Sequence, residues 1–419
     1  MLIFVAVIVA LLVAIVYVNL SAGERRVSHP IEHLYTVDDP QFCRAMGMLL
    51  GPDIVRGNKA TMLVNGDEIF PAMLEGIRGA KKSVLFETFI YWSGEIGDEF
   101  ADALSERARN GVDVRVLIDW VGSIKVDRSL LDKMKEAGVE VHMFHPLRWY
   151  NLGRINNRTH RKLLIVDGTV GFTGGVGIAS PWTGHAQDAD HWRDMHFRVD
   201  GPVVAQMQSV MLSNWSKTTG YILHGPDYFP VLAEAGDHQA QMFSSSPSGG
   251  SDSMHLMYLI AITAAVKTID MSSAYFVPDE MARVALVAAM KRGVRVRVIT
   301  PGKHTDQKAV RRASRAVWGA LLEAGAELYE YRHTMYHCKM MMVDGMMSSV
   351  GSTNFDPRSF HLNDEANLNV YDREFTALLT AVFEEDIKHS KRITLEMWQN
   401  RPAVEKVRER LTALMAPML

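Results

Sequence analysis

The sequence repeats itself, and this repeat limits the possible folds of the 419-residue chain more than any other feature. Residues 109–116 (RNGVDVRV) correspond to residues 291–298 (KRGVRVRV), and residues 136–141 (EAGVEV) correspond to residues 323–328 (EAGAEL). Partner segments are separated by roughly 180 residues, which is the length of an ordinary domain rather than of a short solenoid repeat. The pattern therefore predicts one duplicated unit, and a hydrophobic content of 47% is enough for two cores.

Within each copy, apolar strand-like runs alternate with helical stretches. Residues 100–109 and 281–291 show helical spacing, and Gly111 and Gly293 follow them as C-terminal capping glycines commonly do. This alternation predicts an α/β fold whose sheets are covered by helices. A site that takes residues from both copies would lie on the seam between them.

Low-complexity and apolar segments suggest the domain limits. Residues 244–251 (SSSPSGGS) are typical of a linker or mobile loop, and we place the boundary just before them, near Gly236. The expected divisions are a transmembrane anchor (1–20), a membrane-proximal segment (21–59), a first lobe (60–236) and a second lobe (237–419).

A pattern of reactive side chains occurs once in each copy. The lysine is the second residue after the histidine, and an aspartate is the fifth residue after the lysine. A spacing of two in an extended segment places the imidazole and the ammonium on one face. One such triplet is often an ordinary solvated strand face, but two with matching glycine turns are difficult to explain by chance. The six residues are His160, Lys162, Asp167, His337, Lys339 and Asp344.

Two imidazoles and two ammonium groups suit the transfer of a phosphate diester. One neutral imidazole attacks phosphorus to form a phosphohistidine, while the other protonates the leaving alkoxide and later deprotonates the acceptor. Lys162 and Lys339 would neutralise the non-bridging oxygens, so this scheme requires no metal or other cofactor. Ser352 and Asn354 are expected to add hydrogen bonds to the phosphate.

A reactive histidine needs an acceptor that fixes its tautomer. Asp194 and Glu365 occupy comparable positions downstream of the two motifs, each before an alternating strand, and we expect them to orient the imidazoles. The alternative is that they are ordinary strand-edge acids. Asp167 and Asp344 stand in Asp-Gly pairs, where a turn-forming role is at least as reasonable as direct catalysis.

The N-terminus predicts a membrane attachment. Residues 1–18 are apolar and uncharged, which is about the minimum for a membrane-spanning helix. No basic residue precedes this run, so an uncleaved anchor is favoured over a secretory signal. Arg25 and Arg26 follow it, which places the catalytic part on the cytoplasmic side. The net charge of −3 does not favour nucleic acid as a partner, although Arg311 and Arg315 belong to a local basic cluster.

From about Ala60 onward, the sequence resembles the phospholipase D superfamily, whose HxKxxxxD motif occurs twice per active unit. Residues 157–162 (NRTHRK), 351–360 (GSTNFDPRSF) and 362–368 (LNDEANL) look most like bacterial cardiolipin synthases. The resemblance implies two phospholipase D-like lobes, each a mixed β-sheet flanked by helices. It also implies phosphatidyl transfer between phosphatidylglycerol molecules, with His160 as nucleophile and His337 as acid and base.

The resemblance leaves the acceptor open. A hydrolase acting on phospholipid, or with less support on nucleic acid, would share the same covalent intermediate, and a non-catalytic membrane scaffold would have lost a motif residue. Gly177 stands where the family pattern has asparagine, so one phosphate contact of the first half is expected to be missing. Trp149, Tyr150 and Trp182 are candidates for the bilayer interface, although packing on their own domain is the commoner outcome for such residues. Oligomeric state is undetermined.

Overall fold

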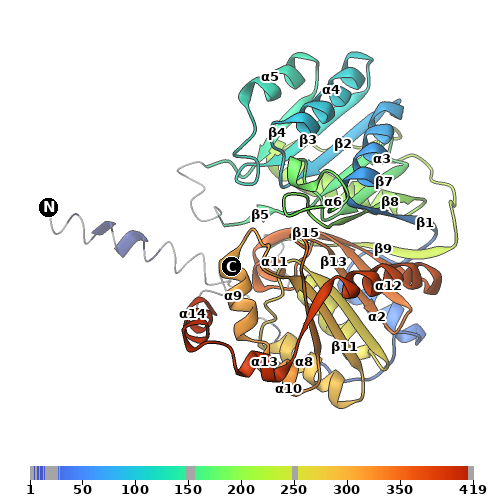
Figure 1. The fold of residues 1–419 in the computed structure, drawn as a ribbon. Coiled ribbons are helices and arrows are strands. Elements are labelled where there is room, and N and C mark those ends of the chain that lie inside the picture. Colours follow the sequence, from blue (N-terminus) through green and yellow to red (C-terminus); the bar gives the residue numbers. More distant parts are fainter. Residues whose placement is uncertain are drawn as a thin grey trace.

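The computed structural model describes residues 29–147, 156–247 and 253–413, together with Val27 and a few isolated positions before residue 15. The chain forms a mixed α/β fold around one long sheet (Figure 1). In Figure 1 the earlier strands, drawn blue to green, lie above the later ones, drawn yellow to red.

The upper part of the sheet has the strand order β4-β3-β2-β6-β7-β8-β1. Strands β2, β3 and β4 are parallel, and β6, β7, β8 and β1 continue from β2 as antiparallel neighbours. The strands are β1 (Val55–Val64), β2 (Ser83–Thr88), β3 (Asp113–Asp119), β4 (Glu140–Phe144), β6 (Leu163–Val166), β7 (Val170–Gly174) and β8 (Met195–Asp200).

The lower part repeats this order as β12-β11-β10-β13-β14-β15, again with three parallel strands followed by antiparallel ones. Strand β16 is added outside β12, and β9 follows β15. These strands are β9 (His238–Ser245), β10 (Thr268–Ser273), β11 (Arg295–Pro301), β12 (Glu327–Tyr331), β13 (Lys339–Val343), β14 (Met347–Gly351), β15 (Asn363–Tyr371) and β16 (Ser390–Ile393).

Two pairings between named strands join the upper and lower parts of the sheet. Strand β1 pairs with β9, which makes the sheet continuous. The short strand β5 (Arg158–Thr159) leaves the upper part and runs parallel to the start of β15, where it pairs with Asn363 and Asp364. The second contact brings the segment that precedes His160 next to the segment that precedes Glu365.

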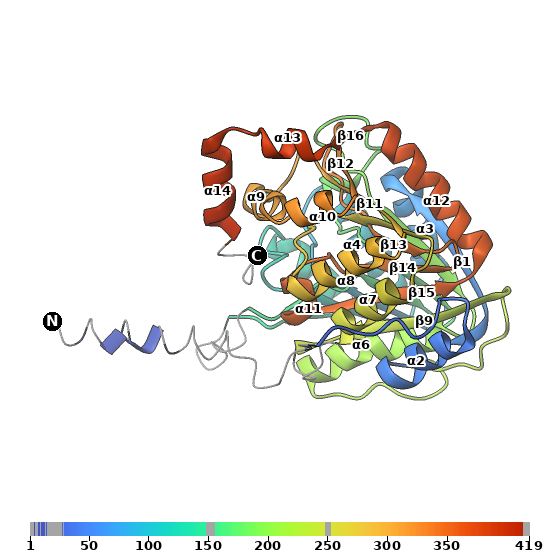
Figure 2. The same ribbon diagram turned by 90° about the horizontal axis from the view of Figure 1, so that it is seen from below.

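Helices cover both parts of the sheet, as Figures 1 and 2 show from two directions. The upper part carries α3 (Asn65–Gly79), α4 (Glu95–Arg109), α5 (Arg128–Glu136), the 3-10 turn η2 (Ser180–Trp182) and α6 (Val204–Thr219). The remaining helices are α2 (Pro40–Leu50), α7 (Ser253–Ala264), α8 (Glu280–Lys291), α9 (Lys308–Ala316), α10 (Gly319–Glu323), α11 (Pro357–His361), α12 (Arg373–Lys388), α13 (Leu395–Gln399) and α14 (Ala403–Ala413).

Alternate strand residues face different cores, as the two-residue period of a strand requires. Leu163 and Ile165 of β6 join a central core that also contains α6 and α12, whereas Leu164 and Val166 face an outer core with α3 and α4. Met341 of β13 faces a second outer core with α7 and α8. The central core contains residues from both parts of the chain, so it fixes the position of one part against the other.

Several sequence expectations can be compared with these elements. Both expected helices are present, and Gly111 and Gly293 have the positive φ angles of capping glycines.

The linker expected at residues 244–251 was placed too early in the chain, because Ser244 and Ser245 belong to β9 and pair with β15. Most of the expected anchor, together with Trp149 and Tyr150, lies outside the described residues. Among the described helices, none combines the length and apolar character required to cross a bilayer.

Candidate active site

The sequence motifs meet in a pocket of about 310 Å³ that is lined by both parts of the chain. Its wall contains both motif histidines, and Lys162 lies beside His160 in the lining. Aromatic and apolar side chains supply much of the remaining wall. The lining residues are Phe89, Ile90, Val121, Arg158, His160, Lys162, Trp182, Trp192, Tyr275, Asp306, Gln307, Val310, His337, Asn354, Asp356, Arg358, Ser359 and Asn363.

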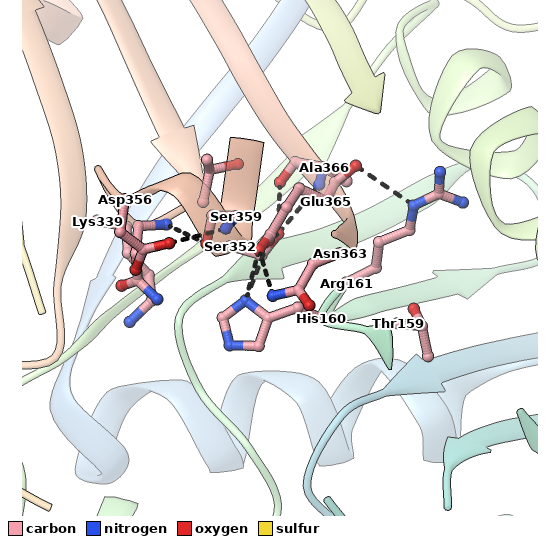
Figure 3. A network of polar contacts seen from close by, with 12 residues as sticks. Thr159, His160, Arg161, Lys339, Ser352, Asp356, Ser359, Asn363, Glu365 and Ala366 are labelled. Atoms are coloured by element: carbon pink, nitrogen blue, oxygen red, sulfur yellow. Dashed lines mark hydrogen bonds and ion pairs between the residues drawn. The ribbon is translucent and has the colours of Figure 1, made fainter. Parts of the chain in front are cut away.

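His160 is held by the lower part of the chain through its main chain and its side chain. Its backbone N–H donates to the carbonyl of Asp364 at 2.9 Å, which continues the pairing between β5 and β15. Its ring Nδ1 lies 3.0 Å from each carboxylate oxygen of Glu365 (Figure 3). The neighbouring Arg161 donates to the Glu365 carbonyl, so two consecutive residues grip the start of β15.

His337 is held in the same way by the upper part. Its backbone N–H donates to the carbonyl of Arg193 at 2.8 Å, and its Nδ1 lies 2.7 Å from Oδ2 of Asp194. The orienting carboxylates are therefore exchanged between the two parts. Each histidine is paired with the acid that follows the motif of the other part, an arrangement that the sequence left open.

The carboxylates define which ring nitrogen is available for chemistry. An ionised carboxylate only accepts hydrogen bonds, so Nδ1 of each neutral histidine carries the proton and Nε2 retains its lone pair. Burial lowers the pKa of His160 to about 4 and the pKa of His337 to about 3. Burial alone would raise the pKa values of Glu365 and Asp194, but their histidine partners lower them below the usual range. At neutral pH both rings are neutral and both acids are ionised.

The two lysines lie beside the histidines of their own motifs. Lys162 Nζ donates to the His160 carbonyl at 2.7 Å, and Lys339 Nζ donates to the His337 carbonyl at 2.6 Å. Lys339 Nζ also lies within 3.1 Å of both ring nitrogens of His337. Burial lowers the pKa of Lys162 to about 7 and also lowers that of Lys339. A bound anion would favour the charged form of both lysines.

The two motif aspartates have the turn-forming role that the sequence offered beside direct catalysis, so their grouping with the reacting residues is corrected. Asp167 accepts hydrogen bonds from the backbone N–H groups of residues 81–83, and Asp344 accepts from those of residues 266–268. Each aspartate and the glycine after it have positive φ angles, as in a type I′ hairpin turn. Their carboxylates tie these turns to the starts of β2 and β10, outside the pocket lining.

Of the two expected phosphate ligands, only Asn354 lines the pocket. Its Oδ1 is buried and makes no hydrogen bond with the described residues, so this side chain retains polar capacity toward the pocket. The Ser352 hydroxyl instead donates to Oε2 of Glu365 at 2.5 Å, as Figure 3 shows. This contact corrects the assignment of Ser352 to the phosphate, because the hydroxyl is already committed to the acid that holds His160.

The two halves of the site differ where the sequence departs from the family pattern. Gly175 takes the position that corresponds to Ser352, and a Cβ there would lie 2.2 Å from an oxygen of Asp194. Trp182 donates its Nε1–H to Asp194 at 2.9 Å, so an indole replaces the missing hydroxyl. Trp182 also occupies the neighbourhood of Gly177, where a Cβ would lie 3.2 Å from the indole and 2.8 Å from Ile90. The chain therefore has no room for the asparagine expected at this position.

Trp182 is not an interfacial residue, because its side chain is 1% exposed and its ring packs 5.3 Å from that of His337. Trp192 packs 5.4 Å from the same imidazole, and Phe89 lies 5.2 Å from His160. The sequence reasoning did not assign these aromatic residues to the site. The only available indication was the position of Phe89 directly after the strand β2.

Two acids in the pocket wall were also missed. Burial raises the pKa of Asp356 to about 7, and burial also raises the pKa of Asp306, whose Oδ2 accepts from the Tyr275 hydroxyl at 2.6 Å. Asp356 caps α11 by accepting from the backbone N–H of Ser359. An aspartate directly before a proline is typical of the start of a helix, so the sequence around Asp356 indicated a helix cap rather than a pocket residue.

The repeated sheet and a pocket with two acid-oriented histidines define a phospholipase D-like protein. The phosphatidylserine synthase of Haemophilus influenzae Rd KW20 has a similar fold, with a TM-score of 0.64 over 87% of this chain and 97% of that chain at 14% identity. Its likeness concerns the fold alone.

The sequence comparisons identify the family. The model of the family described as cardiolipin synthase, PLD-like domain, matches residues 73–211 and 258–387. Cardiolipin synthase of Geobacillus kaustophilus (strain HTA426) is 37% identical over 365 residues, covering 86% of this chain and 72% of that protein. Cardiolipin synthase 2 of Bacillus anthracis is 35% identical over 360 residues, covering 85% and 70%. This chain belongs to the cardiolipin synthase, PLD-like domain family, which confirms the resemblance seen in the sequence.

Proposed function

We propose that this protein is a phosphatidyltransferase that makes cardiolipin from two molecules of phosphatidylglycerol through a phosphohistidine. The observation that carries the proposal is the exchanged pairing, in which Glu365 orients His160 and Asp194 orients His337 at one pocket. Neither acid contacts an Nε2 atom, and Nε2 of His337 faces Nζ of Lys339 at 3.1 Å. Two successive displacements at one phosphorus would use these two nitrogens.

In the first step, Nε2 of neutral His160 attacks the phosphorus of the first phosphatidylglycerol. The bond from phosphorus to the glycerol oxygen breaks, and protonated His337 donates its proton to this oxygen, so glycerol leaves. The resting pKa of His337 is low because of burial and of the ammonium of Lys339. An anionic diester beside these groups pairs with the ammonium and raises the pKa of the imidazole, which permits its role as an acid.

In the second step, His337 removes the proton from the terminal hydroxyl of a second phosphatidylglycerol. The resulting oxygen attacks the phosphohistidine, the phosphorus–nitrogen bond breaks, and cardiolipin forms while His160 returns to its neutral state. His337 is again protonated, so the proton balance of the cycle closes. The ammonium groups of Lys162 and Lys339 stabilise the charge on the non-bridging oxygens in both steps.

The surface beside the pocket supports a lipid substrate. Val121 lines the pocket and is 42% exposed, and Ile124 in the same loop is 74% exposed. The basic cluster that would favour nucleic acid is partly neutralised, because Arg311 and Arg315 both form ion pairs with Glu330 and Arg315 also pairs with Glu409. Apolar groups at the opening and paired charges nearby fit an acyl-chain environment better than a polyanion groove.

The organisation expected from the sequence forms part of this proposal. Residues 1–20 act as a single membrane anchor with the catalytic part in the cytoplasm, and residues 60–236 and 237–419 act as the two phospholipase D-like lobes. An anchored enzyme meets phosphatidylglycerol at the bilayer surface, where its substrate is concentrated.

Product analysis tests the proposal directly. The full-length protein is incubated with vesicles of phosphatidylglycerol, and lipid products and released glycerol are measured together. We expect cardiolipin and glycerol in equal amounts, and we expect His160→Ala and His337→Ala each to abolish both. Phosphatidic acid as the sole lipid product would indicate hydrolysis instead, and full activity in either variant would refute the two-histidine mechanism.

A further inference from the structure

A second cluster of metal-binding side chains lies in the lower part of the chain, separate from the residues that line the pocket. It consists of His255 near the start of α7, Asp279 at the N-cap of α8 and His361 at the end of α11. One potential ligand atom from each residue lies within 4.8 Å of the other two. The three residues come from three separate helices and form no linear motif, so no sequence pattern announced them.

His255 is the residue whose environment most clearly indicates a ligand. Its side chain is 2% exposed, and its Nδ1 makes no hydrogen bond with any described residue. The ring stacks on Phe360, with 4.9 Å between ring centroids, and its Nε2 lies 3.3 Å from Oδ2 of Asp279. Asp279 is thus the polar neighbour of Nε2, whereas Nδ1 has no hydrogen-bond partner among the described residues. A buried imidazole that is only partly satisfied is costly unless a further partner binds it.

Asp279 is fixed in a position suitable for a ligand. One carboxylate oxygen accepts from the backbone N–H of Ala282 at 2.9 Å and caps α8, while the other faces His255. The ring of His361 lies nearly perpendicular to that of His255, with 5.5 Å between centroids. A capped carboxylate beside two imidazoles is preorganised, so little side-chain freedom remains to be lost on binding.

We propose that His255, Asp279 and His361 bind one divalent transition-metal ion of the Zn²⁺ class. Two imidazoles and one carboxylate are a common ligand set for this ion, with bond lengths of about 2.0–2.2 Å. Bonds of that length place neighbouring ligand atoms about 3.4 Å apart in a tetrahedral site, so the cluster contracts slightly around the ion. A water molecule completes the coordination on the side where Asp279 and His361 are partly exposed.

The ion would stabilise one wall of the active-site pocket. His361 ends the five-residue helix α11, whose Arg358 and Ser359 line the pocket. Linking this short helix to α7 and α8 reduces its freedom to shift relative to the rest of the fold. The site therefore acts as a structural brace that is independent of the proposed transfer chemistry.

Metal binding is tested on the untagged full-length protein after removal of bound metals with a chelator. Zn²⁺ is titrated by calorimetry, and the absorption spectrum with Co²⁺ reports the coordination geometry. We expect one ion per chain, a Co²⁺ spectrum of tetrahedral intensity and a higher thermal midpoint with Zn²⁺. Absence of stoichiometric binding would overturn the proposal.

Variants distinguish this cluster from other histidines. Asp279→Asn keeps an N-capping side chain and should still fold. We expect Asp279→Asn and His255→Gln each to weaken metal binding by more than about tenfold. Loss of a residue that only contacts a ligand can already cost about tenfold, so loss of a ligand itself should cost more. His224→Gln, at an exposed position, should bind normally, and so should His337→Ala in the pocket. Unchanged affinity in Asp279→Asn, or loss of the ion in His337→Ala, would refute the assignment.

Discussion

The exchanged pairing makes a specific prediction for Glu365→Gln. Glu365 is fully buried and accepts from Nδ1 of His160 at 3.0 Å, from the Ser352 hydroxyl at 2.5 Å and from Asn363 Nδ2 at 3.3 Å. A glutamine preserves the shape but replaces one acceptor oxygen with a donor NH₂ group. Because donors already face both oxygens, the amide cannot satisfy all of them.

The size of the effect follows from these contacts. Loss of a hydrogen bond to a charged group costs about 1.5–3 kcal/mol, which corresponds to a rate loss of roughly 10- to 150-fold. If the amide donates to Nδ1, the proton moves to Nε2 and the nucleophile is blocked. The wrong tautomer of a catalytic histidine beside an amide in place of its acid reduces turnover by roughly 10⁴-fold. We therefore expect a loss of between about 10- and 10⁴-fold in the rate of cardiolipin synthesis.

The assay separates the two half-reactions. With radiolabelled phosphatidylglycerol and rapid quenching, Glu365→Gln should slow formation of the labelled protein, because His160 is the proposed nucleophile. Asp194→Asn should instead act through His337 and affect both proton transfers. The exposed Glu396→Gln serves as a control for a charge lost elsewhere, and thermal unfolding verifies that each variant is folded.

A wild-type rate of label incorporation in Glu365→Gln would refute the reasoning. Label on His337 rather than on His160, located by peptide mapping, would reverse the proposed roles but leave the exchanged pairing intact. The two outcomes are therefore distinguishable within one experiment.

Three further predictions concern pH and stability. The ammonium of Lys162 is present below its pKa of about 7 and is lost above it, so kcat/KM should fall as the pH rises through about 7. An anionic substrate raises this pKa when it binds, so kcat should fall only at a higher pH. A limit above pH 9 in kcat/KM would contradict the assignment. Asp344→Ala leaves three backbone N–H groups without their acceptor and should lower the free energy of unfolding by about 3 kcal/mol in denaturant titrations. Gly177→Asn should lower it by about 1–3 kcal/mol without increasing activity, because its Cβ would lie 2.8 Å from Ile90; greater activity would show that the missing asparagine matters.

Structural features that depend on residues close together in the chain were predicted correctly from the sequence. The helices α4 and α8, with their capping glycines, follow from local spacing and backbone preference. These features depend on periodicity within one element, which the order of residues specifies directly.

The sequence also singled out the two histidine–lysine pairs as candidates for one site, and the structure places both histidines in the wall of one pocket. What each polar group contacts did not follow from the sequence. The Ser352 hydroxyl is used by Glu365 rather than left for a phosphate, and Asp167 and Asp344 hold strand starts. A residue type shows what a group can do, whereas its neighbours determine which of these possibilities is used.

Only the tertiary structure decided which acid serves which histidine. Pairing of β5 with β15 brings His160 to Glu365, and the equivalent contact of His337 with the segment at Arg193 brings it to Asp194. These partners are 205 and 143 residues apart in the chain. The same packing placed Trp182 against Asp194 in the role that Ser352 has beside Glu365. Such contacts arise from how the two parts pack together, and local sequence preference carries no record of that packing.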